Sequence, residues 1–286
     1  MQSFTLSAAG VRMPRMIYGT AWKKTDTARL VELALRTGFR GIDTACQPKH
    51  YDEAGVGAGI VACLNTSFGR ADLYLQSKYT PASGQDPRRI PYDPKEPLPA
   101  QVAKSFAASL RHLRTDYLDC LVLHSPLPTA EQTMTVWRAF EALIDAGHVR
   151  QLGISNCYRC RDLETLYQRA RIKPAVVQNR FSAENAYDRE IRTFCTEHKL
   201  VYQSFWTLTA NPHILGHPIV TTLAATYARK PAQIVFRYLT QADVVPLVGT
   251  KSENHMRQDL AIFDFALTSA ERLAIDGLLQ GIQASA

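Results

Sequence analysis

Short apolar segments alternate with longer segments of helical periodicity along nearly the whole chain. In the first pair, the apolar run 16–21 precedes residues 27–38, whose leucines recur at helical spacing until Gly38 ends the pattern. The expected strands are 16–21, 39–43, 73–78, 118–124, 149–155, 175–178, 200–205 and 243–249. The helices expected after them are 27–38, from about 53, 98–113, 135–147, 158–170, 188–198, 221–229 and 255–263, and a last helix is expected near 267–279.

The alternation predicts a barrel of parallel strands. Strands that alternate with helices of about 10 to 15 residues form parallel sheets with right-handed crossovers. Eight such units fit a closed (β/α)₈ TIM barrel better than an open Rossmann sheet, because no G-x-G-x-x-G follows the first strand. Residues 4–6 and 11–14, separated by Ser7–Gly10, are expected to form a short N-terminal β-hairpin that caps one end. We therefore expect one domain over 1–286, although this length alone would suggest about two domains.

Two long loops are expected over one mouth of this barrel. Residues 81–99 hold six of the 15 prolines and follow the third strand. Residues 207–218 follow the seventh strand. Loops after barrel strands lie at the C-terminal mouth, where the active sites of such barrels are built.

Composition narrows the class of protein. With 46% hydrophobic and 21% charged residues, the chain has the material for a large core, which excludes a disordered, fibrous or disulfide-scaffold protein. We expect no membrane helix and no signal peptide, hence a cytoplasmic protein with reduced cysteines. The net charge of +7 is scattered, so it indicates a phosphorylated cofactor at least as well as nucleic acid, and a merely solvated basic surface is the alternative.

Three titratable residues follow neighbouring strands at the point where each strand ends. They are Asp43, Lys78 and His124. Each alone could cap a helix or meet solvent, but together they converge at one rim of the barrel. Tyr51 joins them from the loop after the second strand. An ammonium beside a tyrosine eases proton release, so the set suits carbonyl reduction: Tyr51 gives a proton to oxygen, Asp43 holds Lys78, and a neutral His124 orients the carbonyl.

The chain resembles the aldo-keto reductases over essentially its full length. The resemblance rests on GTAWK at 19–23, GFRGIDTA at 38–45, SKY at 77–79, DYLDCLVLHSP at 116–126, GISN at 153–156 and PAVVQ at 174–178. It implies a barrel that binds NADP(H) without a Rossmann domain, and a catalytic tetrad of Asp43, Tyr51, Lys78 and His124.

The tyrosine loop departs from the family pattern. The family places its tyrosine three residues before a glutamate, whereas Tyr51 stands two residues before Glu53. An ungapped match from Glu53 would put His50 in the acid position. We favour Tyr51, because the loop has extra residues in any case and no other tyrosine is near; whether His50 contributes to catalysis stays open.

The resemblance also implies a cofactor site. Ser155, Asn156 and Gln178 match residues that bind the nicotinamide carboxamide. The stacking tyrosine of the family is replaced by Gln203, so Phe205 or Trp206 is expected to supply the flat surface. The cofactor residues expected are Thr20, Ser155, Asn156, Gln178, Ser204, Phe205, Gly249, Thr250, Lys251, His255, Gln258 and Asp259. The substrate pocket is expected to contain Trp22, Ser125 and Trp206.

The segment 246–259 is the candidate phosphate-binding segment. Gly249, Thr250 and Lys251 offer backbone N–H groups, a hydroxyl and an ammonium at a helix N-terminus. His255 replaces the arginine of the family and binds a phosphate dianion less strongly. We therefore expect NADPH as the preferred cofactor, with NADH also possible.

These patterns predict an NADPH-dependent oxidoreductase that reversibly reduces a small-molecule aldehyde or ketone, as a monomer or weak homodimer. Two alternatives are a Schiff-base lyase that uses Lys78 and a cofactor-binding regulatory barrel with little turnover. We expect no nucleic-acid partner, because the chain has no recognisable motif for one. We also expect no metal site, because Cys157 and Cys160 form a half-motif with no second pair at zinc-ligand spacing.

Overall fold

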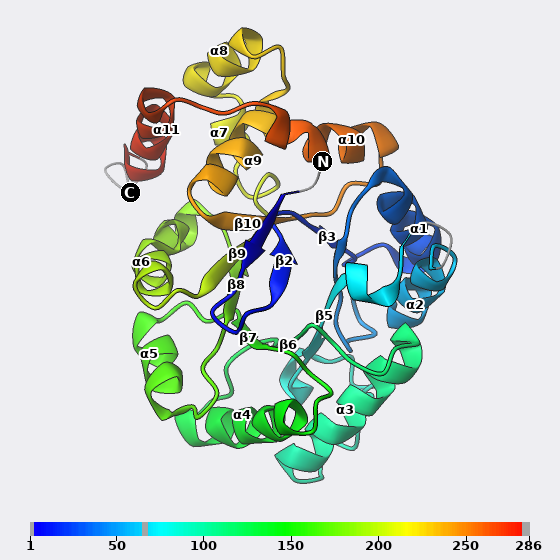
Figure 1. The fold of residues 1–286 in the computed structure, drawn as a ribbon. Coiled ribbons are helices and arrows are strands. Elements are labelled where there is room, and N and C mark those ends of the chain that lie inside the picture. Colours follow the sequence, from blue (N-terminus) through cyan, green and yellow to red (C-terminus); the bar gives the residue numbers. More distant parts are fainter. Residues whose placement is uncertain (1–2, 65–67, 282–286) are drawn as a thin grey trace.

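A closed barrel of parallel strands forms the centre of the molecule (Figure 1). The structure, a computed structural model, describes residues 3–64 and 68–281. Within these ranges, the barrel strands are β3 (Ile17–Gly19), β4 (Gly41–Asp43), β5 (Tyr74–Tyr79), β6 (Cys120–Leu123), β7 (Leu152–Ser155), β8 (Val176–Arg180), β9 (Val201–Phe205) and β10 (Val244–Val248). The pairing of Leu247 with Ile17 closes the ring between β10 and β3. The predicted (β/α)₈ fold is confirmed.

Helices surround this barrel and bury their apolar faces against it (Figure 1). They are α1 (Thr27–Thr37), α2 (Glu53–Val61), α3 (Leu98–Leu113), α4 (Ala130–Asp145), α5 (Cys160–Arg169), α6 (Arg189–Glu197), α9 (Pro231–Gln241) and α10 (Glu253–Leu260). Helix α1 shows why the sequence pattern predicted a helix. One face of it is buried, at Leu30, Val31, Ala34 and Leu35, and Gly38, at φ 122°, ends the helix. Short 3₁₀ helices occupy Lys24–Asp26, Arg70–Asp72, Ala82–Gly84, Ala183–Asp188 and Ala261–Asp264.

The connection between β9 and β10 differs from the prediction. The helix expected at 221–229 exists as α8 (Pro218–Thr226), but α8 lies at the periphery, whereas α9 packs against the barrel (Figure 1). The sequence therefore predicted α8 but not α9, the helix that covers the barrel before β10. Pro218 and Pro231 each begin a separate helix, and Ile234 and Leu239 give α9 its fully buried face. The chain also adds the one-turn α7 (Pro212–Leu215) and ends in α11 (Ser269–Gly281).

The predicted N-terminal hairpin is confirmed. Strands β1 (Phe4–Leu6) and β2 (Arg12–Pro14) pair antiparallel, and Gly10, at φ 75°, lies in the turn between them. The hydroxyl of Ser7 donates to Oε1 of Gln151, just before β7 begins. The hairpin thus closes the N-terminal end of the barrel and leaves the opposite mouth open to ligands.

A chain of buried polar side chains runs through the barrel from this hairpin to the open mouth. Nε2 of Gln151 donates to the Tyr74 hydroxyl at 3.1 Å, and that hydroxyl donates to Oε1 of Gln76 at 2.9 Å. Nε2 of Gln76 then donates to Oδ1 of Asp43 at 2.6 Å. These groups are buried and mutually hydrogen-bonded, which offsets their desolvation. We call Ser7, Gln151, Tyr74, Gln76 and Asp43 the polar column.

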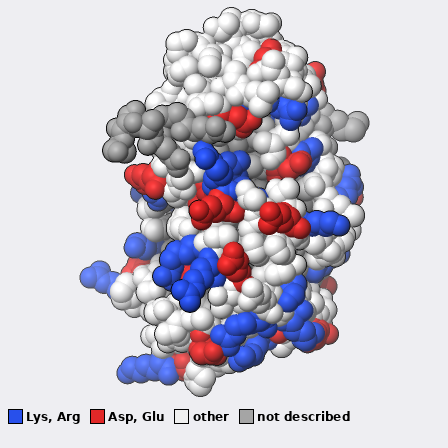
Figure 2. Space-filling view, turned by 90° about the vertical axis from the view of Figure 1, so that its left-hand side faces the viewer, with Lys and Arg blue, Asp and Glu red and all other residues white. Residues whose placement is uncertain are grey.

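Charged side chains are mixed on the surface. On the face drawn in Figure 2, Lys and Arg side chains alternate with Asp and Glu. Many are paired within one element, such as Arg36 with Glu32 at 2.8 Å. On this face the positive charge is scattered, as the sequence indicated. No helix in 3–64 and 68–281 is both long and apolar enough to cross a membrane.

Candidate active site

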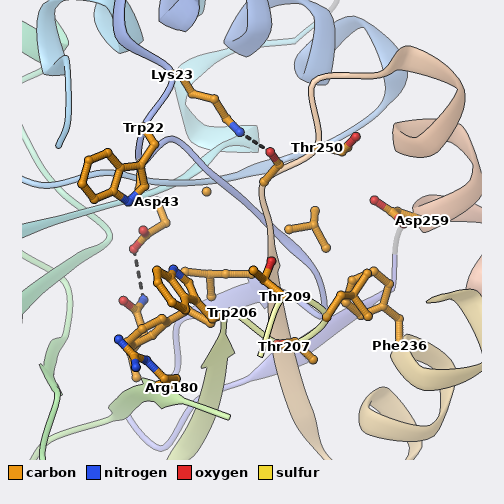
Figure 3. Close-up of a pocket in the computed structure, with 18 of the residues that line it drawn as sticks. Trp22, Lys23, Asp43, Arg180, Trp206, Thr207, Thr209, Phe236, Thr250 and Asp259 are labelled. Carbon is orange, nitrogen blue, oxygen red and sulfur yellow. Dashed lines mark hydrogen bonds between the residues drawn. The ribbon is translucent and has the colours of Figure 1, made fainter. Parts of the chain in front are cut away.

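A cavity of about 1410 Å³ opens at the C-terminal ends of the barrel strands (Figure 3). Ligand pockets commonly measure about 300 to 1,000 Å³, so this one has room for a large cofactor and a small substrate together. Every predicted site residue lines it except Thr20, Lys78 and Ser204. Those three are buried below its surface: the Thr20 hydroxyl donates to the Asp43 carbonyl, and the Ser204 hydroxyl accepts from Thr207.

Asp43 and Lys78 form a buried ion pair under the cavity. Asp43 ends β4, and Lys78 lies near the end of β5, so adjacent parallel strands bring them to one rim. Nζ of Lys78 lies 2.6 Å from Oδ1 of Asp43 and 2.9 Å from the Thr44 carbonyl oxygen. Burial lowers the pKa of Lys78, and the negative charge of Asp43 opposes that shift. Oδ1 also accepts from Gln76 and Gln178, so the carboxylate is held from several sides.

Tyr51 and His124 lie next to this pair. Nζ of Lys78 is 5.3 Å from the ring centroid of Tyr51, and the ring centroids of Tyr51 and His124 are 6.0 Å apart. Burial, and then the charge of Asp43, raise the pKa of Tyr51. The sequence-based expectation that Lys78 would ease ionisation of Tyr51 is therefore outweighed by burial. The structure does bring the four predicted side chains together.

Burial favours the neutral form of His124. Burial, followed by the charges of Lys78 and His50, holds its pKa well below the usual value. Its Nδ1 lies 2.7 Å from Oγ1 of Thr80, a residue that the sequence reading did not select. A Thr80 hydroxyl that donates to Nδ1 leaves the ring proton on Nε2.

His50 occupies a different position from Tyr51. Its ring lies against the indole of Trp22, with 3.9 Å between centroids, and its backbone carbonyl oxygen accepts from the backbone N–H of Trp22. Both His50 and Tyr51 line the cavity, but Tyr51 has the ring contact with Lys78. This placement favours Tyr51 as the acid.

The side chains predicted to hold a carboxamide meet at the ends of β7 and β8. Nδ2 of Asn156 donates to the His124 carbonyl oxygen at 2.8 Å, and the residue adopts φ 52°. Nε2 of Gln178 donates to Asp43 and to Gln203, which leaves Oε1 of Gln178 as an acceptor. Ser155 lines the cavity beside them.

Gln203 cannot provide a flat platform, because it points into the barrel. Its amide exchanges hydrogen bonds with Gln76 at 2.9 and 3.0 Å and also contacts the sulfur of Met13. Phe205 and Trp206, which follow on the chain, both line the cavity. Trp206 adopts φ 56° and is 47% exposed, so its indole is available to a ligand.

The predicted phosphate-binding segment lies at the far end of the cavity. Residues 249–252 lead into the N-terminus of α10, where the Ser252 side chain accepts from the backbone N–H of His255. Lys251 is exposed and lies 3.7 Å from Asp26. Nδ1 of His255 lies 3.4 Å from Oγ1 of Thr250. The segment therefore presents one flexible ammonium and a helix N-terminus to the cavity.

Two ionisable side chains, those of Lys23 and Asp259, also lie at this end of the cavity. Lys23, which the sequence reading passed over although it ends the GTAWK string, is buried and donates to the Gly249 carbonyl oxygen. Burial, and then the charge of Lys251, lower the pKa of Lys23 to about 8. Burial raises the pKa of Asp259 to about 7. A lysine whose pKa is lowered by burial and an acid whose pKa is raised by burial thus line the predicted phosphate end together.

Both long loops reach the cavity, the loop 81–99 through Gly84 and the loop 207–218 through several residues. In the loop 81–99, the Tyr92 hydroxyl donates to the Thr80 carbonyl oxygen at 2.6 Å, and Gln85 donates to the Cys46 carbonyl oxygen at 2.9 Å. In the loop 207–218, Thr207, Leu208 and Thr209 line the cavity.

Cys46, Cys120, Cys157, Cys160 and Cys195 are free thiols. Cys157 is buried, and burial raises its thiol pKa to about 12, while Cys160 begins α5. Burial also raises the pKa of Cys46, beside the tyrosine loop. Thiols protonated at neutral pH are poor nucleophiles and metal ligands.

Comparisons with known proteins place this geometry among its relatives. The family model described as "Aldo/keto reductase family" matches residues 15–211, which include Asp43, Tyr51, Lys78 and His124. The uncharacterized oxidoreductase YtbE of Bacillus subtilis is 28% identical over 277 residues, covering 96% of this chain and 92% of that protein. Glyoxal reductase of Bacillus subtilis is 28% identical over 271 residues, covering 94% and 90%. The crystal structure of an aldo/keto reductase from Brucella melitensis superposes with a TM-score of 0.83 at 27% identity, covering 97% of this chain and all (100%) of that one.

Proposed function

The chain belongs to the aldo/keto reductase family, and on that premise we propose that it reduces an aldehyde or ketone with NADPH, using Tyr51 as the proton donor. The observation that carries the proposal is the convergence of Tyr51 and His124, which line the large cavity, on the Lys78–Asp43 pair buried beneath it. The relatives are named as oxidoreductases, which supports this class of reaction.

The lining of the cavity fits a phosphorylated nicotinamide cofactor. Lys23, Thr250 and Lys251 surround the end at the N-terminus of α10, where anions bind favourably. Asn156 and Gln178 offer amide groups at the other end, near Asp43. When bound, such a cofactor supplies a hydride to the carbonyl carbon.

Side chains of the protein supply the proton that the carbonyl oxygen takes up. The raised pKa keeps Tyr51 protonated at neutral pH, so its O–H is available to the carbonyl oxygen as negative charge develops there. The ammonium of Lys78 stabilises the phenolate left behind, and Asp43 keeps that ammonium charged and in place. Neutral His124, with its Nδ1 held by Thr80, donates from Nε2 and orients the same oxygen.

The charges at the phosphate end support a preference for NADPH with weak discrimination against NADH. Lys251 attracts the additional phosphate of NADPH, but it is an exposed and solvated ammonium. His255 is a weaker phosphate partner than an arginine, and the ionised form of Asp259 repels phosphate.

The substrate is expected between Trp22 and Trp206, which are 51% and 47% exposed, with Ser125 on the same wall. The two exposed indoles can pack against the apolar part of a small-molecule carbonyl. A Schiff-base lyase is less compatible with the geometry, because Lys78 is 1% exposed and does not line the cavity.

The test is NADPH oxidation with a panel of aldehydes and ketones by the wild type, Tyr51→Phe and His50→Ala. We expect Tyr51→Phe to lose about 100-fold or more in kcat, within the range of general acid catalysis, while it still binds NADPH. His50→Ala should keep most activity.

The opposite pattern, with activity in Tyr51→Phe and none in His50→Ala, would make His50 the acid. Tight NADPH binding without turnover of any carbonyl would favour the regulatory barrel. Equal or higher kcat/KM with NADH would overturn the cofactor preference.

A further inference from the structure

Arg180 is a cation in the cavity that neither the ion pair nor the phosphate end uses. It is the last residue of β8, and its backbone N–H donates to the Tyr158 hydroxyl at 3.2 Å. In Figure 3, Arg180 lies on the same side of the cavity as Trp22, Asp43 and Trp206. Thr250, Asp259 and Phe236 lie on the other side. Arg180 therefore belongs to the part of the cavity where we expect the substrate.

The positive charge of Arg180 is poorly compensated. Its nearest carboxylate is that of Glu184, whose oxygen lies 4.0 Å from Nη1 and whose side chain is 85% exposed. An exposed ion pair of this kind contributes little and is screened by salt. Nε of Arg180 is buried and donates to no acceptor among the residues that the structure describes, so the exposed Nη groups are the ones that a ligand can reach.

Trp206 holds the guanidinium in a position where its donors remain usable. The guanidinium carbon lies 4.4 Å from the ring centroid of Trp206. Stacking occupies the face of the guanidinium, whereas its N–H groups lie in the plane and point outward. Stacking on Trp206 thus holds the guanidinium in one orientation before a ligand binds. This preorganisation lowers the entropy cost of binding.

Resting on the proposed function, we propose that Arg180 binds a carboxylate of the substrate, so that the protein prefers aldehydes or ketones that also carry a carboxylate group. A planar guanidinium matches a carboxylate with two parallel hydrogen bonds. The lysines of the described cavity lining lie elsewhere: Lys23 donates to Gly249, Lys251 lies near Asp26, and Lys230 adjoins Gln233 at the start of α9. A single guanidinium carries one positive charge, so it compensates a carboxylate monoanion fully and a phosphate dianion only in part.

The test uses a pair of aldehydes that differ in charge and little in shape, para-carboxybenzaldehyde and para-carbamoylbenzaldehyde. For the wild type we expect kcat/KM to be about 10- to 100-fold higher for the carboxylate, the usual worth of a hydrogen-bonded charged pair. Arg180→Met should remove this preference by raising KM for the carboxylate, with little change in kcat or in the kinetics of the amide. Arg180→Lys should restore part of it.

Three controls separate this role from others. Arg169→Met removes an arginine that pairs with Glu131 on the outside of the barrel, and we expect it to leave both substrates unaffected. The Kd of NADPH should be the same in Arg180→Met and wild type; weaker NADPH binding would assign Arg180 to the cofactor and overturn the inference. If Arg180→Met does not fold, Arg180→Gln replaces it, and the wild-type preference is measurable without any variant.

The two proposals fail in different ways. If the wild type turns over neither this pair nor any other carbonyl of the panel, the proposed reduction fails. If it reduces both aldehydes equally well, and Arg180→Met changes neither, reduction stands and the role of Arg180 is wrong. A preference for para-formylphenyl phosphate over the carboxylate that disappears in Arg180→Met would replace the carboxylate by a phosphate and also overturn the inference as stated.

Discussion

Asp259 is a buried acid whose charge we expect to affect both the free energy of unfolding and the proposed cofactor preference. Its pKa of about 7 in the folded chain lies above the usual value near 4, so the folded state binds this proton more tightly than the unfolded state. Folding stability contributed by this site is therefore present at low pH and is lost as pH rises from about 4 to about 7. At pH 8 the ionised carboxylate lies in the same cavity as Lys251 and His255.

We predict that Asp259→Asn is more stable than the wild type at pH 8 and equally stable near pH 4. A shift of one pKa unit corresponds to about 1.4 kcal/mol, so the gain at pH 8 should be measurable by urea denaturation. At pH 8 the variant should also lower the Kd of NADPH more than the Kd of NADH. Asp264→Asn, at an exposed position, is the control. A stability gain of the same size at both pH values would contradict the assigned titration.

The sequence predicted the side chains at strand ends better than those in loops. Asp43, Lys78 and His124 could be found because parallel strands end at a common rim. Lys23 could not be placed in the same way: Trp22 and Lys24 on either side of it adopt φ 63° and 53°, conformations that residue type rarely indicates. Arg180 could be read as a strand end, but its packing on Trp206 depends on the turn at φ 56° that Trp206 makes.

At the scale of elements, the contact between α2 and α3 depends on a glycine. A Cβ atom added at Gly57 would overlap the backbone carbonyl oxygen of His112 and lie 3.0 Å from the Cα of Leu113. Neither is a side chain that can rotate away. The close approach of these helices behind the tyrosine loop therefore requires glycine.

We predict that Gly57→Ala lowers the free energy of unfolding by about 1 to 3 kcal/mol through overpacking, although alanine favours a helix. Gly277→Ala is the matched control, because Gly277 lies in α11 with nothing within 4 Å of an added Cβ. Gly277→Ala should raise the free energy of unfolding by about 0.5 to 1 kcal/mol. Urea denaturation of both variants measures the contrast, and stabilisation by Gly57→Ala would show that the helices can separate.

The element pattern was predictable wherever one strand and one helix alternated. Between β9 and β10 three helices intervene, and α8 has apolar residues at helical spacing just as α9 does. Periodicity shows that a segment is a helix but not whether it covers the barrel. Burial of Phe236 and Leu239 against the barrel, a tertiary contact, decides between them.

At the scale of the whole molecule, the polar column joins the two ends of the barrel. Tyr74 is its midpoint: the hydroxyl accepts from Gln151 and donates to Gln76, and burial holds its pKa well above the ordinary value. Removing this hydroxyl leaves a buried amide of Gln151 without its acceptor.

We predict that Tyr74→Phe lowers the free energy of unfolding by about 1 to 3 kcal/mol, the cost of an unsatisfied buried donor. Tyr227→Phe, which removes a hydroxyl bonded to Glu271 near the surface, should cost less. Carbonyl reduction should persist in Tyr74→Phe, because Gln178 and Lys78 still hold Asp43. A loss of kcat comparable to that of Tyr51→Phe would show that the column also governs catalysis.

The glutamines around Asp43 make the charge of the site visible to spectroscopy. Gln76 and Gln178 both donate their side-chain amides to the carboxylate, and Gln203 bonds to both of them. Buried amide protons in such bonds exchange slowly with solvent, and their NMR frequencies respond to the charge on the acceptor. Isotope labelling of glutamine would thus report how the surroundings of Asp43 change when a ligand arrives, without a probe inside the cavity.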